Sequence, residues 1–265
     1  MLADSRRMTL DLPYIVLGAC VGFIVGITGV GGGSLMTPAL VLLFGIHPAT
    51  AVGTDLLYAA LTKSVGSLVH AMKRNVDWRV VGLLALGSVP AAAVMLLSLA
   101  QLGPHNGFMT RMITSALGIA LLITAASLVF RRILMAMREL SPERSPGRNA
   151  ALTILTGIIL GVLVSISSVG AGAIGVSALL LLYPSYATSR IVGTDIAHAV
   201  PLTLVAGIGH WLTGSVNLPM LASLTSGSVP AIVLGSYLAP RLPEVGLRYI
   251  LALVLIIVGG KLVVT

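Results

Sequence analysis

The chain has 265 residues, of which 57% are hydrophobic and only 9% are charged, and its mean hydropathy is +1.04. A water-soluble domain carries roughly 25% charged residues to cover its surface, so this composition excludes a soluble protein. The net charge of +8 would suggest nucleic-acid binding in a soluble protein. Here we attribute it to basic cytoplasmic loops and expect no nucleic-acid partner.

Long apolar segments follow one another along the chain. Asp, Glu, Lys and Arg are all absent from 13–44, 80–100, 112–130, 149–183 and 218–240, and few charges occur in the apolar runs 48–72, 188–212 and 249–264. About 20 apolar residues cross the hydrocarbon core of a bilayer, where only helices or closed barrels satisfy the backbone. Because the runs lack the alternation of barrel strands, the sequence predicts an all-α, multi-pass protein in contact with lipid, in the inner (plasma) membrane.

The first of these segments, 13–44, is too long for one ordinary crossing, because a straight helix of this length would measure about 48 Å. Its centre, Gly29 to Gly33, is a poor helix interior. Segment 149–183 has the same excess length and carries Ser165 to Gly172 at its centre. We therefore predict that each segment consists of two half-length helices that meet at a break.

The chain also contains an internal repeat. Residues 22–44 match 161–183 at an offset of 139, and Val52-Gly53-Thr54-Asp55 recurs as Val192-Gly193-Thr194-Asp195 at an offset of 140. In the same register His70 matches His210, and the sequence GSVPA at 87–91 recurs at 227–231. Internal repeats of this kind indicate duplication. We predict a first transmembrane repeat over 1–130, a basic linker over 131–148 and a second repeat over 149–265.

The relation between the repeats depends on the broken segments. A re-entrant hairpin leaves three full crossings per half and inverts the second repeat, whereas a single broken crossing leaves four and keeps the repeats parallel. The positive-inside rule does not distinguish the two arrangements over the whole chain. Loop 73–79 is basic and its counterpart 213–217 is not, which suggests opposite sides of the membrane. We expect inverted repeats.

Both breaks are candidate anion sites. Transporters often build their sites from interrupted helices, whose N-termini attract anions, and glycine lets backbone N–H groups approach an oxyanion. We expect substrate binding by residues of the first break and of the second, namely Thr28, Gly31, Gly32, Gly33 and Ser34, and Ser167, Ser168, Gly170 and Gly172. The alternative is that these small residues only permit close helix packing.

Two acids occupy the same position of the two repeats inside membrane segments. A carboxylate there normally faces a cavity or a partner, so Asp55 and Asp195, with the preceding Thr54 and Thr194, are candidates for gating or for coupling to a proton or sodium ion. The alternative is that each acid pins helices together through hydrogen bonds to the backbone. His198, three residues after Asp195, is a candidate proton relay.

The other polar residues receive weaker assignments. Lys63 could neutralise the bound anion, partner Asp55 or extend to the interface, and we place it at the substrate site. His70 and His210 are expected to be structural anchors, and Tyr58 is grouped with the aromatic residues of an interfacial belt. No close His/Cys cluster occurs, so neither a metal site nor another cofactor is expected.

The motifs GVGGGSLMTPAL and AVGTD, together with the second VGTD, resemble the TauE/SafE sulfite exporter family, also called the toluene sulfonate uptake permeases, over roughly 15–264. The resemblance implies a secondary transporter, not an enzyme, that moves sulfite, organosulfonates or related small sulfur-containing anions, often outward from the cytoplasm. An uptake permease or channel for another small anion stays open, as does homo-oligomer formation. Ala171 stands where the first half has Gly32, so equal participation of both breaks is in doubt.

Overall fold

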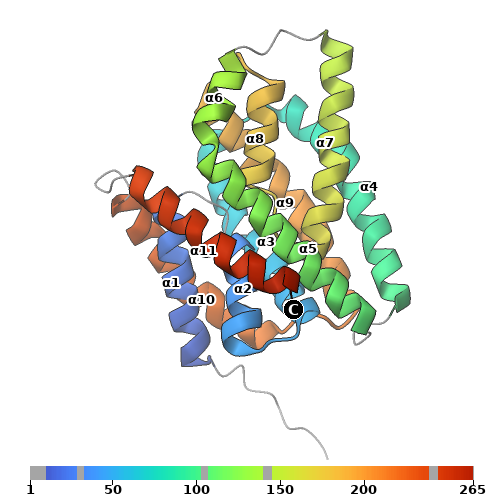
Figure 1. The fold of residues 1–265 in the computed structure, drawn as a ribbon, viewed down its shortest axis with the longest axis vertical. Coiled ribbons are helices and arrows are strands. Elements are labelled where there is room, and N and C mark those ends of the chain that lie inside the picture. Colours follow the sequence, from blue (N-terminus) through green and yellow to red (C-terminus); the bar gives the residue numbers. More distant parts are fainter. Residues whose placement is uncertain (1–9, 29–32, 103–106, 140–144, 239–243, 265) are drawn as a thin grey trace, which may run out of the picture.

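The computed structural model describes residues 10–28, 33–102, 107–139, 145–238 and 244–264. Within these ranges the chain forms eleven helices and no strand (Figure 1). The first half contains α1 (Leu12–Thr28), α2 (Gly33–Phe44), α3 (Pro48–Met72), α4 (Trp78–Leu102) and α5 (Gly107–Val129). After α6 (Arg131–Glu139) come α7 (Pro146–Ser167), α8 (Ala173–Leu182), α9 (Thr188–Leu212), α10 (Leu218–Leu238) and α11 (Glu244–Val264). The prediction of an all-helical protein is confirmed.

The helices have the length and surface of a membrane protein. Six of the described helices are long and apolar enough to cross a bilayer, namely α4, α5, α7, α9, α10 and α11. Large apolar side chains are exposed on their outer faces, among them Leu86, Leu97, Ile159 and Leu253. Helix α3 is as long as α4 but carries Asp55 and Lys63 in its interior. The chain is therefore a multi-pass membrane protein.

The predicted interruption is confirmed for the second long segment. The predicted break of the first segment falls on residues 29–32, between α1 and α2 and outside the described residues, so Gly31 and Gly32 are not placed. The second break, residues 168–172, separates α7 from α8, and Ser168, Gly170 and Gly172 there have φ values of 60°, 127° and 131°. Because L side chains rarely adopt positive φ, this backbone cannot continue as a helix.

The half-length prediction holds for α1, α2 and α8 but not for α7. Helices α1, α2 and α8 have 17, 12 and 10 residues, whereas α7 has 22 and is long enough to cross a bilayer. The prediction was wrong for α7 because this helix begins at Pro146, inside the presumed linker. Proline at the first helical position is already constrained to a helical φ, and it follows Ser145 at the N-cap. The remainder of the linker includes α6.

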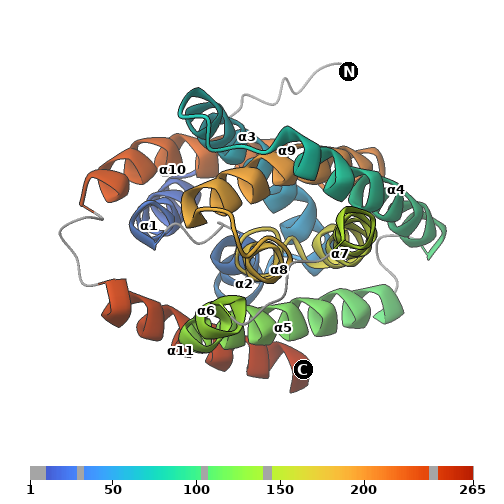
Figure 2. The ribbon, with the colours of Figure 1, turned by 90° about the horizontal axis from the view of Figure 1, so that it is seen from above.

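Each half packs mainly against the other half. Helix α1 lies along α10, and α7 lies along α4, while α3 contacts α9 and α5 contacts α11. Seen from above, α2 and α8 lie at the centre, between the layer of α5 and α11 and the layer that contains α3 and α9 (Figure 2). The short helices that follow the breaks are therefore enclosed by helices from both repeats.

Glycines explain why these pairs approach so closely. A Cβ atom at Gly22 of α1 would overlap Ser228 of α10, and one at the equivalent Gly161 of α7 would overlap Ser88 of α4. The glycine of each GSVPA motif makes the reciprocal contact, since Gly227 packs on the backbone of α1 and Gly87 on that of α7. Small residues permit close packing of membrane helices, and here they do so at equivalent places in both repeats.

Candidate functional site

The two breaks meet at the centre of the molecule. Gly33, the first residue of α2, packs so closely on the carbonyl oxygen of Ser168 that a Cβ atom would overlap it. A small cavity beside this contact is lined by Ser34, Thr124, Ser168, Val169, Gly170, Ala171 and Ala173. It has room for about one water molecule. The structure thus brings predicted residues of both breaks together around one polar cavity.

The cavity faces the beginnings of two helices. Helix α2 starts at Gly33 and α8 at Ala173, with Gly172 as its N-cap residue. The first N–H groups of a helix have no intrahelical acceptor and give that end a positive partial charge. Thr124 of α5 was missed by the sequence analysis, because a lone threonine in an apolar run carries no signal of its own. Its buried hydroxyl has no hydrogen-bond partner among the described residues.

Other predicted residues of the breaks lie at helix ends. Thr28 is the last residue of α1. Ser167 is the last residue of α7, and its hydroxyl donates to the carbonyl of Leu163 at 2.7 Å and accepts from the N–H of Val169 at 3.2 Å. These bonds hold the end of α7 where the chain leaves the helix. Ser167 therefore supports the backbone of the second break.

Asp55 joins α3 to both breaks. The residue is fully buried, and its carboxylate accepts a hydrogen bond of 2.5 Å from the hydroxyl of Thr37 in α2. The side chain of Ser168 in the second break also lies near it. A buried charge of this kind needs hydrogen-bonding partners. Asp55 has one in Thr37 of α2, whereas its other carboxylate oxygen has no hydrogen-bond partner among the described residues.

Asp195 occupies the equivalent position in α9 but has different surroundings. It is 1% exposed, and neither carboxylate oxygen has a hydrogen-bond partner among the described residues. One oxygen faces Gly175 of α8 so closely that a Cβ atom there would overlap it. The backbone of Gly172 is the nearest polar group of the second break. The two equivalent acids are therefore not in equivalent environments.

Lys63 lies at the second break. Its Nζ atom donates a hydrogen bond of 2.9 Å to the carbonyl oxygen of Ala171, one of the residues that line the cavity. It also interacts electrostatically with both Asp195 and Asp55. The bond to Ala171 holds the side chain at the second break, near both acids and the cavity lining.

Thr54 and Thr194 bind loops of the opposite half. The Thr54 hydroxyl accepts the N–H of Asn217 at 3.1 Å, and the Thr194 hydroxyl accepts the N–H of Asp77 at 2.9 Å. Asn217 and Asp77 are themselves equivalent in the repeat. Thr54 thereby ties α3 to the loop before α10, and Thr194 ties α9 to the loop before α4.

His198 and Tyr58 form a second pair of equivalent contacts. The Nε2 atom of His198 lies 2.8 Å from the hydroxyl of Ser88, and the hydroxyl of Tyr58 is hydrogen-bonded to that of Ser228. Tyr58 is buried, so its assignment to an interfacial belt was wrong. The repeat itself carried the missing signal, because Tyr58 aligns with His198, three residues after the acid in each half.

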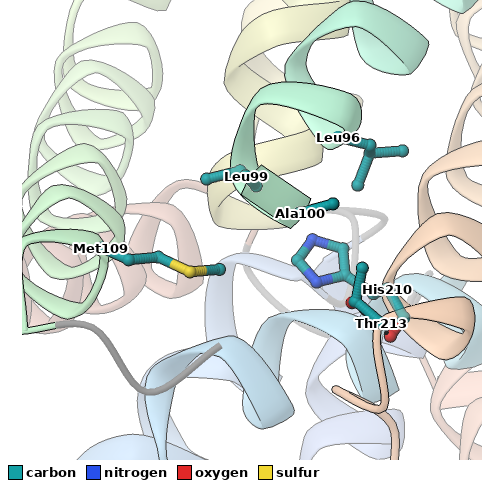
Figure 3. Close-up of a pocket in the computed structure, with 6 residues that line it drawn as sticks. All are labelled: Leu96, Leu99, Ala100, Met109, His210 and Thr213. Atoms are coloured by element: carbon teal, nitrogen blue, oxygen red, sulfur yellow. Dashed lines mark hydrogen bonds between the residues drawn. The ribbon is translucent and has the colours of Figure 1, made fainter. Parts of the chain in front are cut away.

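His210 lies in a separate, apolar pocket near the end of α9. Figure 3 shows its ring between Leu96 and Leu99 of α4 and Met109 of α5, with Ala100 and Thr213 completing the lining. Its Nε2 atom lies 2.9 Å from the carbonyl oxygen of Ser165, in the last turn of α7. Such carbonyls lack an intrahelical donor, so the contact is that of a structural anchor.

A cluster of polar residues, which we call the linker-side cluster, joins the α3–α4 loop to the α8–α9 loop. Asp77 accepts hydrogen bonds from the hydroxyl of Tyr186 at 2.9 Å and from Arg190 at 2.6 Å, and Arg190 lies over the Tyr186 ring. Arg138 of α6 donates to the carbonyls of Pro184 and Tyr186. The sequence did not reveal this cluster, because its members come from three separate segments.

Ionisation of the linker-side cluster follows from these contacts. Burial alone would raise the pKa of Asp77, but hydrogen bonds from Tyr186 and the N–H of Val80, together with the charge of Arg190, outweigh it and hold the pKa below its ordinary value. Burial and the hydrogen bond to Asp77 raise the pKa of Tyr186. Asp77 is therefore ionised at neutral pH.

The family of the chain is clear from comparison with known proteins. A family model described as Sulfite exporter TauE/SafE matches residues 14–262. The probable membrane transporter protein YjnA of Bacillus subtilis (strain 168) is 39% identical over 258 residues, which cover 96% of this chain and 100% of the relative. YdhB of the same organism is 27% identical over 242 residues, which cover 91% and 94%.

More distant relatives extend to archaea. The probable membrane transporter protein MJ0441 of Methanocaldococcus jannaschii is 25% identical over 273 residues, which cover 94% of each chain. No solved structure matches the chain significantly. The family model and the relatives span nearly the whole chain, including both breaks and both acids. The chain therefore belongs to the TauE/SafE sulfite exporter family and is a membrane transporter.

Proposed function

We propose that this transporter moves sulfite, organosulfonates or related small sulfur-containing anions across the plasma membrane, and that it exports them from the cytoplasm. The single observation that carries the proposal is the meeting of the two breaks at a polar cavity beside Lys63. Moving an anion through lipid requires groups that replace its hydration shell. Hydroxyls, helix N-termini and one ammonium group are suited to that role.

The cavity is smaller than the proposed cargo. Sulfite has four heavy atoms and the smallest sulfonates have more, whereas the cavity has room for about one water molecule. The anion can bind only if the breaks move apart. We therefore propose that Gly33, Ser34, Ser168 and Gly170 separate to admit the anion.

We propose that the repeats are inverted and that alternating access exchanges their roles. The reciprocal packing of α1 on α10 and of α7 on α4 is typical of repeats related by a pseudo-two-fold axis. The basic loop 73–79 and its uncharged counterpart 213–217 favour an axis in the membrane plane, which inverts the repeats. In this arrangement the α1–α2 and α7–α8 hairpins enter from opposite sides. The linker-side cluster would close the path on the linker side, and its opening would accompany release on that side.

Coupling completes the proposed mechanism. Asp55, Asp195 and His198 surround the breaks without belonging to the cavity lining, so a proton or sodium ion bound among them could change the affinity for the anion. Thr54 and Thr194 would transmit movement of the acids to the loops that they bind. Carboxylates normally repel anions, so a coupling role fits these acids better than direct contact with substrate.

Flux measurements test the proposal directly. The purified protein would be reconstituted in liposomes, and uptake of radiolabelled sulfite and methanesulfonate would be followed under imposed pH and sodium gradients. We expect saturable flux that responds to one of the gradients. Absence of flux above empty liposomes for both anions would refute the substrate class, and currents that ignore both gradients would indicate a channel.

Variants locate the site in the same assay. Ser168→Leu fills the cavity and should raise KM for methanesulfonate more than tenfold, and Ser34→Ala should raise it more modestly. Ser98→Leu is the matched control, because Ser98 lies on the exposed face of α4 and bonds only its own helix at Val94. Equal KM values for Ser168→Leu and the control, at equal amounts of folded protein, would contradict the proposed site.

A further inference from the structure

We infer that the two equivalent acids have different tasks: Asp195 takes up and releases the coupling proton, whereas Asp55 remains hydrogen-bonded and holds α3 to the breaks. This inference rests on the proposed function, in which movement of a proton or sodium ion is coupled to anion movement. It goes further by assigning the proton to one residue. The assignment comes from what each acid faces in the other helices.

The difference begins in the helix that follows each break. Thr37 of α2 donates its hydroxyl to Asp55 at 2.5 Å, but the equivalent residue of α8 is Val176, which has no hydroxyl. Both oxygens of Asp195, but only one oxygen of Asp55, are buried without a hydrogen-bond partner among the described residues. An ionised carboxylate in that setting lacks compensation, whereas a protonated one is far less costly to bury.

The residues that precede Thr37 and Val176 also differ between the surroundings of Asp55 and Asp195. Gly175 of α8 takes the place of Met36 in α2, and Asp195 lies directly against it, with Leu160 of α7 also near that point. Oxygen ligands are few in this apolar setting, and Lys63 already supplies a positive charge nearby. A sodium ion requires several oxygen ligands, so a proton suits Asp195 better.

Charge balance points the same way. The repeat equivalent of Lys63 is Thr203, whose hydroxyl donates to Ala199 in its own helix, so one lysine serves both acids. Two ionised acids and one ammonium would leave a net negative charge in the membrane interior, and one bound proton removes it. Asp55 has the hydroxyl of Thr37 to stabilise its charge. The proton therefore belongs on Asp195.

Other titratable groups lie near Asp195, and two of them, His198 and Asp55, are hydrogen-bonded to other side chains. His198, on α9 itself, is bound by Ser88 of α4, and Asp55 on α3 is bound by Thr37. His70 of α3 lies farther along α9, against Gly193. From α7 and α8 the groups near the carboxylate are Leu160 and the backbone of Gly172, neither of which titrates.

Infrared spectroscopy tests the assignment without any substrate. A protonated carboxyl group has a C=O stretching band that disappears on ionisation, and its pH dependence can be recorded on the reconstituted protein. We expect a titrating band in the wild-type protein that is lost in Asp195→Asn and kept in Asp55→Asn. A titrating band that is lost only in Asp55→Asn, or that survives both substitutions, would overturn the inference.

A reciprocal exchange provides a second test that preserves side-chain shape. Val176→Thr offers Asp195 the hydroxyl that Asp55 has, and should move the titration of its band to lower pH. Thr37→Val removes that hydroxyl from Asp55 and should create a second titrating band. Valine and threonine have nearly the same shape, so folding should persist. An unchanged titration in both variants would contradict the role assigned to the α2 and α8 side chains.

Anion binding separates the inference from the proposed function. Methanesulfonate keeps a single charge over the accessible pH range, so any pH dependence of its binding comes from the protein. Wild-type affinity should fall about tenfold per pH unit above the Asp195 midpoint, and Asp195→Asn should abolish that dependence. A band assigned to Asp195 without methanesulfonate or sulfite binding would refute the substrate class alone, and pH-dependent binding that persists in Asp195→Asn would refute the inference alone.

Discussion

Replacing Asp77 by asparagine should weaken the linker-side cluster and open that side of the transporter more often. The substitution is mild, because asparagine is the natural residue at the equivalent Asn217. There its side-chain oxygen accepts the N–H of Met220 at 3.0 Å, as the carboxylate of Asp77 accepts the N–H of Val80 at 3.2 Å. Asp77→Asn therefore retains the start of α4 and removes only the charge.

The size of the effect follows from the contacts that depend on that charge. The bond from Arg190 spans 2.6 Å, but the side chain of Arg190 is 45% exposed while that of Asp77 is 12% exposed. Exposed ion pairs contribute about 0.2–1 kcal/mol, and the bond from Tyr186 weakens when its acceptor becomes neutral. A total of about 1 kcal/mol changes an opening equilibrium about fivefold.

Cysteine labelling can measure this change. The chain has a single cysteine, Cys20, which is exposed and would be replaced by serine. Ile191→Cys then reports on the linker side, because Ile191 is 1% exposed at the start of α9. The equivalent Ala51→Cys, 0% exposed at the start of α3, reports on the opposite side. A membrane-impermeant maleimide would be applied to each side in turn.

Asp77→Asn should accelerate labelling at Ile191→Cys about fivefold, in proportion to the open fraction. Labelling at Ala51→Cys should not accelerate, because the two sides of an alternating-access transporter do not open together. Equal rates at Ile191→Cys with and without Asp77→Asn would show that the cluster does not hold that side closed. A parallel rise at both reporters would indicate general loosening of the fold.

Three further predictions concern stability in detergent. The pKa of Asp77 in the folded protein lies below its unfolded value of 3.8, so the stabilisation of the fold by ionised Asp77 is complete above about pH 3.8. This stabilisation is lost as the pH falls through the lower folded pKa. The Tm difference between wild type and Asp77→Asn should therefore shrink over the same pH range. Gly227→Ala should lower the free energy of unfolding by about 1–3 kcal/mol, because the added Cβ atom overlaps α1. Gly82→Ala is the control and should not destabilise the protein, since the space around Gly82 is open. Equal Tm values for the two variants would contradict this explanation of the packing. A double-mutant cycle of Tyr58→Phe and Ser228→Ala should give a coupling of about 0.6 kcal/mol, and additivity would count against their hydrogen bond.

Much of the fold could be predicted because it depends on local composition. Uncharged segments of membrane-spanning length and glycines in their centres are visible in the sequence, and the repeat appears as a fixed offset. The start of α7 was misplaced, because Arg148 seemed to belong to a solvated linker although Pro146 begins the helix. Whether the repeats are inverted depends on three-dimensional arrangement, and the sequence offered only the charge of two loops.

The site was less predictable, because its residues meet through long-range packing. Gly33 and Ser168 could be proposed separately, but their contact joins segments on either side of the linker. Thr37 carries no motif, yet its hydroxyl distinguishes Asp55 from Asp195. The buried position of Tyr58 could have been predicted from the repeat, since Tyr58 aligns with His198 in the sequence.

The exchanged helix contacts also constrain how this architecture arose. Helix α1 has its glycine-lined partner in α10, and α4 has its partner in α7, so each half finds its principal neighbours in the other. A polypeptide of half this length would expose those glycine faces unless a second copy covered them. Joining both halves in one chain covers these faces and leaves equivalent positions free to differ, as at Asp77 and Asn217, Met36 and Gly175, and Thr37 and Val176.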